Sequence, residues 1–222
     1  MKTAVTSAMF TSGLLAITSI AASADHHMES AMQFAPVEMM ECSYNEDKDA
    51  EDLEALTDAF TAWVQENDKD YTYWMLWPQF REGSSEWDVG LLGAWTNGAG
   101  FGGGYDAWVE DDDDVGDMFS DVLTCNNSLA AVTQILVPEG GDDWEAGTVW
   151  FQRCEREEGV RLSDAVAAHR EASMATTAMG AESASWAFVP ALGAGDPDFD
   201  YYHVESWPSY GELGESFDNY FN

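Results

Sequence analysis

The stretch WDVGLLGAW at residues 87–95 recurs in a changed form as FDYYHVESW at residues 199–207. Both stretches have aspartate in the second position and tryptophan in the ninth, and they lie 112 positions apart (199 − 87 = 112). The same shift, without a gap, aligns ten identical pairs: Val37/Val149, Cys42/Cys154, Asp52/Asp164, Trp74/Trp186, Pro78/Pro190, Gly83/Gly195, Asp88/Asp200, Trp95/Trp207, Gly102/Gly214 and Asp106/Asp218. Self-similarity at a fixed spacing indicates an internal duplication, so the sequence predicts two copies of one structural unit.

Each copy shows the same order of expected elements. In the first copy, hydrophobic periodicity and turn residues predict strands at 37–44, 71–80, 87–95 and 122–137 and helices at 49–65 and 105–119, with the glycine-rich loop 98–104 as a flexible connection. In the second copy they predict strands at 148–153, 186–192 and 199–207, a helix at 162–179 and a helix beginning at residue 212. Strand, helix, strand, strand, helix, strand is the ferredoxin-like order. The sequence therefore predicts an α+β fold of two tandem ferredoxin-like units, at 37–144 and 145–222, with a linker at 138–143.

Three cysteines give an odd count. The repeat predicts a partner for Cys125 near position 237, so we expect the second unit to be incomplete, with an exposed edge beside residues 148–153. The first and fourth strands of a ferredoxin-like sheet are neighbours, within disulfide range. This predicts a Cys42–Cys125 disulfide and a free thiol at Cys154, with Cys125–Cys154 as the alternative pairing.

The N-terminus and the composition indicate export. Residues 1–24 have the charged start, the apolar stretch and the Ala22-Ser23-Ala24 cleavage site of a secretory signal peptide, followed by a flexible lead at 25–36. The chain has 42 acidic and 8 basic residues and a net charge of −34. Such a charge argues against nucleic acid or anionic lipid as a partner and fits cationic partners, divalent metals or a salty medium. We expect a periplasmic or secreted protein without a membrane span.

The duplicated order resembles the dimeric α+β barrel superfamily, in which two ferredoxin-like units pack sheet to sheet, sometimes within one chain. Antibiotic-biosynthesis-type monooxygenases, haem-binding peroxidase relatives and NIPSNAP-like proteins are members. The resemblance implies an intrachain pseudo-dimer, and hence a monomer, but no catalytic signature of these members matches residue by residue. The paired Cys/Trp/Pro pattern is also similar to uncharacterised exported proteins of marine bacteria, a likeness that implies no activity.

The repeated tryptophans are the first candidate site. Trp74, Trp95, Trp186 and Trp207 either pack the core or line an aromatic cleft between the units that would take a ring-bearing or sugar ligand. The leading hypothesis is accordingly a binding or accessory protein that needs no intrinsic cofactor and takes a small-molecule ligand. Asp88 and Asp200 recur on the opposite strand face, where they could cap a turn or bind arginine.

His203 and Glu205 are the second candidate site. They share one strand face at positions where the first copy has apolar residues, and a carboxylate beside histidine would raise the imidazole pKa and orient the ring. An exposed polar pair is the simpler interpretation. The alternative is an enzyme, of oxygenase or isomerase type, that uses these two groups for acid–base chemistry on a small aromatic substrate.

Metal binding is the third hypothesis. Cleavage after Ala24 would leave Asp25-His26-His27 at the start of the chain, where the amine, two amides and the imidazole of His27 could bind Cu(II) or Ni(II) in a tetragonal nitrogen site. The acidic run at 110–117 lacks the spacing of a calcium loop, and the loop at 98–104 lacks the lysine and serine or threonine of a phosphate-binding loop. The acidic run is therefore interpreted as a solvated charge cluster and the loop as a flexible connection.

Overall fold

The structure is a computed structural model that describes residues 32–80, 87–110, 114–138 and 146–221. Contacts gather Met32–Asn222 into one compact unit. The expected signal peptide, the Asp25-His26-His27 site and most of the expected linker lie outside the described residues. None of the helices within the described ranges is long and apolar enough to span a membrane.

The described residues form twelve elements. In chain order these are β1 (Ala35–Tyr44), α1 (Ala50–Asn67), β2 (Tyr71–Leu76), β3 (Val89–Trp95), α2 (Gly98–Glu110), α3 (Val115–Val122), β4 (Leu123–Leu136), β5 (Thr148–Cys154), α4 (Leu162–Ala178), β6 (Ala184–Leu192), β7 (Tyr201–Trp207) and α5 (Tyr210–Phe221). Their order matches the sequence prediction except between β3 and β4, where two helices replace one.

The strands form a single antiparallel sheet in the order β2-β3-β1-β4-β6-β7-β5. Its first four strands have the ferredoxin-like order, and β6-β7-β5 repeats three of the four positions. The strand register repeats as well: Val37 lies opposite Ala94, and Val149, 112 residues later, lies opposite Ser206. The tandem ferredoxin-like α+β fold predicted from the sequence is confirmed, with β2 and β5 at the edges of the described sheet.

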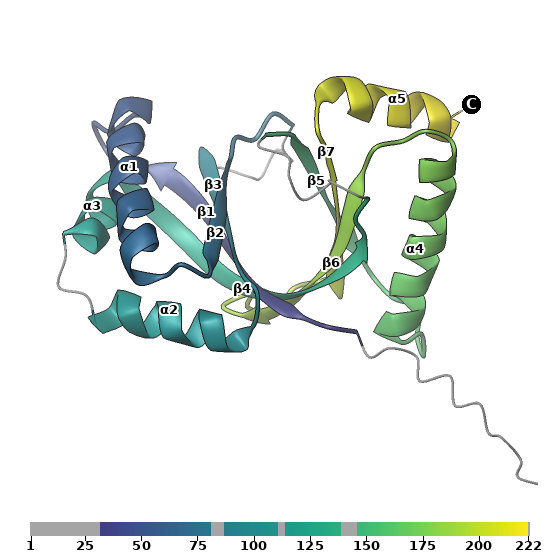
Figure 1. Cartoon of the computed structure of the whole chain (residues 1–222), viewed down its shortest axis with the longest axis horizontal. Coiled ribbons are helices and arrows are strands. Elements are labelled where there is room, and N and C mark those ends of the chain that lie inside the picture. The colour runs from purple at the N-terminus through teal and green to yellow at the C-terminus, as the bar shows by residue number, and fades with distance from the viewer. Residues whose placement is uncertain (1–31, 81–86, 111–113, 139–145, 222) are drawn as a thin grey trace, which may run out of the picture. The chain divides into compact units, whose positions relative to one another are not determined.

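The sheet curls, and its helices lie on the outer side of the curl (Figure 1). Residues alternate between the two faces along each strand. On β1, Met40 and Cys42 pack toward the helices, whereas Val37 and Met39 belong to a cluster on the inner face. That inner cluster joins both repeats, because it also contains Phe188 of β6 and other residues of β5 and β7.

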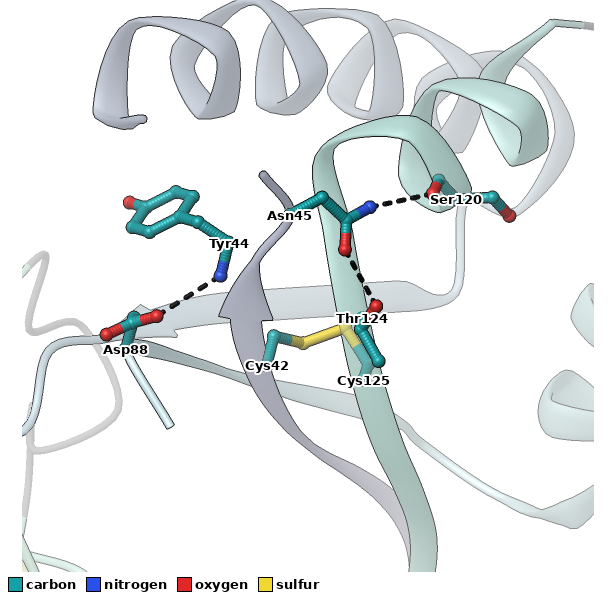
Figure 2. Close-up of a disulfide and its surroundings, with 7 residues drawn as sticks. All are labelled: Cys42, Tyr44, Asn45, Asp88, Ser120, Thr124 and Cys125. Carbon is teal, nitrogen blue, oxygen red and sulfur yellow. Dashed lines mark hydrogen bonds between the residues drawn. A yellow bond between two sulfur atoms is a disulfide. The ribbon is translucent and has the colours of Figure 1, made fainter. Parts of the chain in front are cut away.

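The Cys42–Cys125 disulfide is confirmed. The two residues lie opposite each other on β1 and β4, with their Cα atoms 4.0 Å apart, and the bond closes a sequence separation of 83 residues. Figure 2 shows the bond beside the end of β1, where the backbone N–H of Tyr44 donates to Asp88. Cys154 is a half-buried free thiol.

The glycine-rich segment is a helix, contrary to our expectation of a flexible loop. Glycine is unfavourable in a helix, but here a cap and tertiary packing outweigh that cost. Asn97 accepts hydrogen bonds from the backbone N–H groups of Ala99 and Gly100 at 2.9 and 3.1 Å. Phe101 and Tyr105 then pack against Trp95, with ring centroids 5.1 and 5.8 Å apart. The helix expected at 105–119 is therefore divided between α2 and α3.

Candidate ligand-binding site

A cavity of about 360 Å³ lies in the first repeat, between the sheet and the helices. Ligand sites typically range from about 300 to 1,000 Å³. Its lining residues come from β1, β2, β3, β4 and the three helices: Glu38, Met40, Phe60, Trp63, Asp68, Tyr71, Trp95, Gly104, Tyr105, Trp108, Gly116, Phe119, Ser120, Leu123, Cys125 and Asn127. Seven of these side chains are aromatic and none is basic. Ser120 and Asn127 are exposed to solvent and mark the outer side of the cavity.

Glu38 is a buried acid on the sheet floor of this cavity. Only 5% of the residue is exposed. The hydroxyl of Tyr105 donates to Oε1 at 2.6 Å, and the hydroxyl of Tyr71 donates to Oε2 at 3.2 Å. Burial raises the pKa of Glu38, while the two tyrosine hydrogen bonds oppose that rise. Burial also raises the pKa of both tyrosines, so their hydroxyls remain protonated donors.

Asp68 supplies a second buried carboxylate to the same cavity. It follows the last turn of α1, is 7% exposed, and accepts a hydrogen bond from the indole Nε1 of Trp95 at 2.8 Å. This contact requires a glycine on α2, since a Cβ at Gly104 would lie 1.9 Å from Oδ2 of Asp68 and 2.8 Å from Nε1 of Trp95. Gly104 therefore lets α2 lie close over the acid and the indole.

A second glycine makes room for Tyr71. A Cβ at Gly93 on β3 would lie 1.9 Å from the hydroxyl oxygen of Tyr71. Without that side chain, the tyrosine ring can lie across β3 and direct its hydroxyl to Glu38. The glycines at 93 and 104 are thus part of the site, although they carry no functional group.

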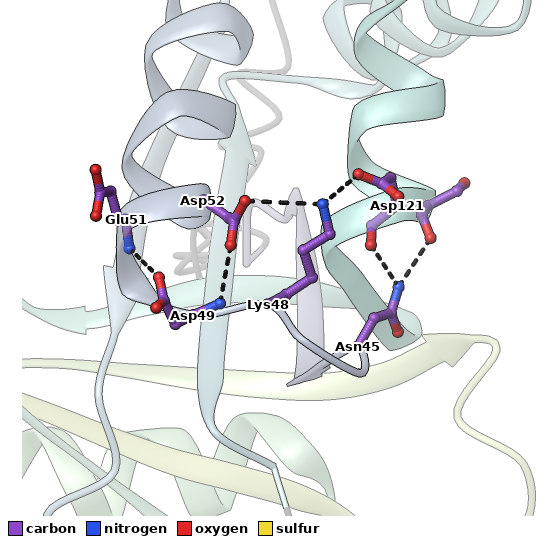
Figure 3. A network of polar contacts seen from close by, with 7 residues as sticks. Asn45, Lys48, Asp49, Glu51, Asp52 and Asp121 are labelled. Carbon is purple, nitrogen blue, oxygen red and sulfur yellow. Dashed lines mark hydrogen bonds and ion pairs between the residues drawn. The ribbon is translucent and has the colours of Figure 1, made fainter.

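Polar contacts hold α3, which supplies one wall, against the end of β1. The side-chain amide of Asn45 donates to the carbonyls of Ser120 and Asp121 at 2.9 and 3.0 Å. Lys48 forms ion pairs with Asp121 and, at 3.7 Å, with Asp52 of α1. Figure 3 shows these bonds converging from both helices on the loop between β1 and α1. The loop therefore fixes the two helices relative to each other beside the cavity.

The second repeat has the same strand register but different side chains at the positions that build the cavity. Adding 112 to each number gives the counterparts: Glu38 becomes Trp150, Trp63 becomes Ala175, Asp68 becomes Gly180, Tyr71 becomes Ser183, Gly93 becomes Glu205, Gly104 becomes Ser216 and Tyr105 becomes Phe217. The tryptophan that both repeats share also has a different partner in each. Nε1 of Trp95 donates to Asp68, whereas Nε1 of Trp207 donates to the hydroxyl of Ser216 at 2.9 Å. The acid-and-aromatic lining is therefore specific to the first repeat.

The four predicted tryptophans do not gather around one cleft. Trp95 and Trp207 are 4% exposed and lie on the helix-covered face, each in its own repeat. Trp74 is on the opposite face of β2 from Tyr71 and Tyr73, and Trp186 packs in the inner cluster. Of the four, Trp95 alone lines the cavity described above.

His203 and Glu205 both lie under the helices of the second repeat. The ring of His203 stacks on that of His169 from α4, with centroids 4.0 Å apart, and Nε2 of His169 is 2.8 Å from the hydroxyl of Tyr201. His203 is 7% exposed, and its Nε2 has no hydrogen-bond partner among the described residues. Burial, and secondarily His169, lower the pKa of His203 to about 4, whereas burial raises that of Glu205. The sequence pattern pointed to His203 but not to its partner His169.

The repeated aspartates have one shared structural role. Asp88 accepts a hydrogen bond from the backbone N–H of Tyr44 at 3.2 Å, and Asp200 accepts one from the backbone N–H of Arg156 at 2.6 Å. Both donors lie two residues after the repeated cysteine. Asp200 also forms an ion pair with the Arg156 guanidinium at 3.1 Å. These carboxylates therefore fasten the end of one strand to the start of another.

The first-repeat cavity offers no suitable ligand to haem iron. Haem iron is held by histidine, by cysteine thiolate, by methionine together with histidine, or by tyrosine. The lining of the cavity contains no histidine, its cysteine, Cys125, is in the disulfide, and the hydroxyls of Tyr71 and Tyr105 both donate to Glu38. This lining therefore does not fit haem. Across the ranges that the structure describes, no group of three or more His, Cys, Asp or Glu residues is arranged to hold a metal ion.

Comparison with known proteins identifies the fold. No family model and no curated protein sequence matches the chain. A solved structure assigned as a chlorite dismutase is similar with a TM-score of 0.53 at 11% identity, covering 85% of this chain and 86% of that one. The chlorite dismutase of Candidatus Nitrospira defluvii in complex with imidazole gives 0.48 at 10% identity, covering 83% of this chain and 81% of that one. The first likeness shows the fold alone, an α+β barrel fold like that of the chlorite dismutase-like structure.

Proposed function

We propose that this chain is an exported binding protein that holds a small organic molecule in the cavity of its first repeat. The observation that carries the proposal is the cavity of about 360 Å³ with seven aromatic rings and two buried acids on its walls. An aromatic cleft was expected between the two repeats, whereas this cavity lies inside one of them. We therefore assign the expected aromatic-lined site for a small molecule to the first repeat.

The repeat comparison favours binding over a purely structural role. Trp63, Tyr71 and Tyr105 correspond to Ala175, Ser183 and Phe217, and the second repeat folds with the same strand register. The fold therefore does not require the larger and more polar set. Burying the Glu38 carboxylate also costs free energy, which is typical of groups kept for function.

Export rests on the signal-peptide pattern and on the disulfide, because disulfides persist in oxidising compartments. A periplasmic or secreted location fits both features. Small organic solutes are the partners that the proposal requires, and neither nucleic acid nor a membrane surface is among them.

Tryptophan fluorescence can test the proposal. Three variants are compared with wild type: Tyr105→Ala and Trp108→Ala open the cavity wall, and Phe217→Ala, at the position corresponding to Tyr105, is the matched control. A library of small cations, neutral alcohols and aromatic acids is titrated into each protein together with wild type. We expect saturable binding of at least one compound to wild type and Phe217→Ala. The affinity for that compound should be at least tenfold lower in Tyr105→Ala. Equal binding in Tyr105→Ala and wild type would contradict the proposed place.

A second candidate function is acid–base catalysis in the second repeat. It is favoured by the buried Nε2 of His203, which has no hydrogen-bond partner within the described part of the chain and belongs to a ring stacked on His169 and its tyrosine partner. In this proposal His203 and Glu205 act on a small aromatic substrate. His203→Leu, which installs the residue found at the corresponding position 91, should abolish turnover. Unchanged turnover in that variant would exclude the role.

The N-terminal metal site is a separate prediction. Addition of Cu(II) to the mature protein should give a visible d–d absorption band that is lost in His27→Ala, because the imidazole of His27 completes the nitrogen set with Asp25 and His26. If the band is absent, or persists in the variant, this site does not exist.

A further inference from the structure

Resting on the proposed function of the cavity, we infer that its ligand is an organic cation with an alkylated ammonium head, bound against the indole and phenol rings that line the cavity and paired with the Glu38 carboxylate. Four observations carry this inference, and they are independent of the fold comparison.

The first observation is that the two buried acids of the cavity form no ion pair among the described residues. Glu38 and Asp68 border the same cavity at 5% and 7% exposure. None of the ion pairs among the described residues involves either acid, and no lysine, arginine or histidine lines the cavity. A buried carboxylate without a cationic partner is costly unless it is protonated or a ligand supplies the charge.

The second observation is the geometry around Glu38. Tyr71 and Tyr105 each donate to a different carboxylate oxygen, at 3.2 and 2.6 Å. A carboxylate has about four lone-pair sites, so two such bonds orient the group and leave acceptor capacity on both oxygens. The cavity also adjoins that group. The acid is therefore fixed in place, with capacity for one more positive partner.

The third observation is the aromatic wall. Trp63 and Trp108 meet at an interplanar angle of 88° with centroids 5.0 Å apart, and Trp95 packs on Tyr71 with centroids 4.5 Å apart. All four of these rings line the cavity. The electron-rich faces of indole and phenol attract cations, and quaternary ammonium groups are the ligands that aromatic boxes recognise. An ammonium that carries methyl groups also gains from leaving water, which a hydrated metal ion would not.

The fourth observation is long-range charge. With 42 acidic and 8 basic residues, the chain attracts cations and repels anions at low ionic strength. An anionic ligand would meet both this field and the two buried acids. A zwitterion would bring its own carboxylate against them. The preferred class is therefore a net cation rather than an amino acid or a carboxylic acid.

The experiment compares choline with 3,3-dimethylbutan-1-ol, its neutral isostere, by tryptophan fluorescence and calorimetry at 0.15 M salt. Wild type should bind choline at least tenfold more tightly than the alcohol. Glu38→Gln should lose at least tenfold in choline affinity and little in alcohol affinity. Glu41→Gln is the matched control: it removes the same charge from the same strand, on the opposite face, and should bind choline like wild type.

The outcomes separate this inference from the proposed function. If the alcohol binds as tightly as choline, or if Glu38→Gln and Glu41→Gln weaken choline equally, the cation inference is wrong. If compounds that bind in a Tyr105-dependent manner are all neutral or anionic, the cavity is a binding site but its ligand is of another class. If nothing binds in a Tyr105-dependent manner, the proposed function fails as well.

Discussion

Glu38 is a buried acid that the stability of the fold does not explain, and the residues around it are specific to the first repeat. The acid occupies a position that the second repeat fills with Trp150, yet both positions lie on the same face of corresponding strands. Its raised pKa follows chiefly from lost hydration. Because the folded-state pKa lies above the unfolded value, its contribution to stability is greatest at low pH and is lost as the pH rises through the folded pKa.

Glu38→Gln should therefore stabilise the ligand-free protein more at pH 8 than at pH 5. At pH 8 the wild-type fold bears the cost of a buried charge, whereas at lower pH the protonated acid resembles the amide. Urea unfolding of both proteins at the two pH values measures the difference in unfolding free energy, with Glu41→Gln as control. A difference that does not change with pH would show that Glu38 titrates as an ordinary exposed acid.

His203 should have the opposite pH dependence. Its folded-state pKa of about 4 lies below the ordinary value near 6.5, so its stabilising contribution is present above about pH 6.5 and is lost as the pH falls toward 4. His203→Leu should reduce the acid-induced loss of stability over that range by up to about 3 kcal/mol. Equilibrium unfolding at pH 7 and pH 4.5 tests this, and parallel pH curves for variant and wild type would contradict it.

Individual site residues were only partly predictable from the sequence. Trp95 was found because the repeat aligns it with an identical residue, Trp207. His203 was found because the repeat aligns it with an apolar residue, Leu91. Glu38 was missed, because one acid among 42 has no distinguishing pattern until its burial is known. The comparison of Glu38 with Trp150 at the repeat spacing was the signal that could have found it.

Helices and strands followed the sequence pattern wherever hydrophobic periodicity or turn chemistry was strong. Helix α1 begins at the expected acidic segment, where Asp49 accepts from the backbone N–H of Glu51 and Asp52 accepts from that of Asp49. The first turns of helix α2 were missed because local propensity argues against five glycines in its first seven positions, while its packing on Trp95 cannot be seen in sequence. Tertiary contacts decided that segment.

Two glycines of α2 offer a matched pair of substitutions. Gly104→Ala places a Cβ 1.9 Å from the Asp68 carboxylate and should cost about 1–3 kcal/mol of stability. Gly103→Ala meets nothing within 4 Å and should stabilise the protein by about 0.5–1 kcal/mol, because alanine favours the helix. Thermal and urea unfolding compare them. Equal effects would mean that α2 does not lie closely over Asp68.

The disulfide between β1 and β4 should contribute strongly to the stability of the first repeat. Its 83-residue separation is long enough for the chain-entropy estimate to reach about 4 kcal/mol, and native bonds typically contribute about 2–5 kcal/mol. Replacing both Cys42 and Cys125 by alanine should lower the unfolding free energy by that amount. Cys154→Ala is the control and should cost less than about 1 kcal/mol. Similar losses in both variants would contradict a special role for the bond.

Across the whole molecule, duplication supplies the sheet and the repeats then differ in their chemistry. The tandem ferredoxin-like order was predictable because ten identical pairs share one register. The place of the cavity was not predictable from the sequence. The sequence predicted that the repeated tryptophans of both units share one site, whereas the structure divides them between the two faces of the sheet. Function on this account belongs to the residues that the repeats do not share.

The net charge of −34 makes a prediction for the molecule as a whole. Self-repulsion among 42 acidic residues destabilises the compact state and is screened by salt. Raising sodium chloride from 0.05 to 0.5 M should therefore raise the melting temperature by several degrees. A melting temperature that falls or stays constant with salt would show that repulsion does not limit stability.

Native mass spectrometry of the protein purified from its own host, with wild type, Tyr105→Ala and Phe217→Ala measured side by side, shows whether the first repeat holds a ligand. We expect a bound small molecule in wild type and Phe217→Ala that leaves on denaturation, and its loss in Tyr105→Ala. A bound mass retained in Tyr105→Ala, or bare polypeptide in all three proteins, would contradict a ligand site in the first repeat.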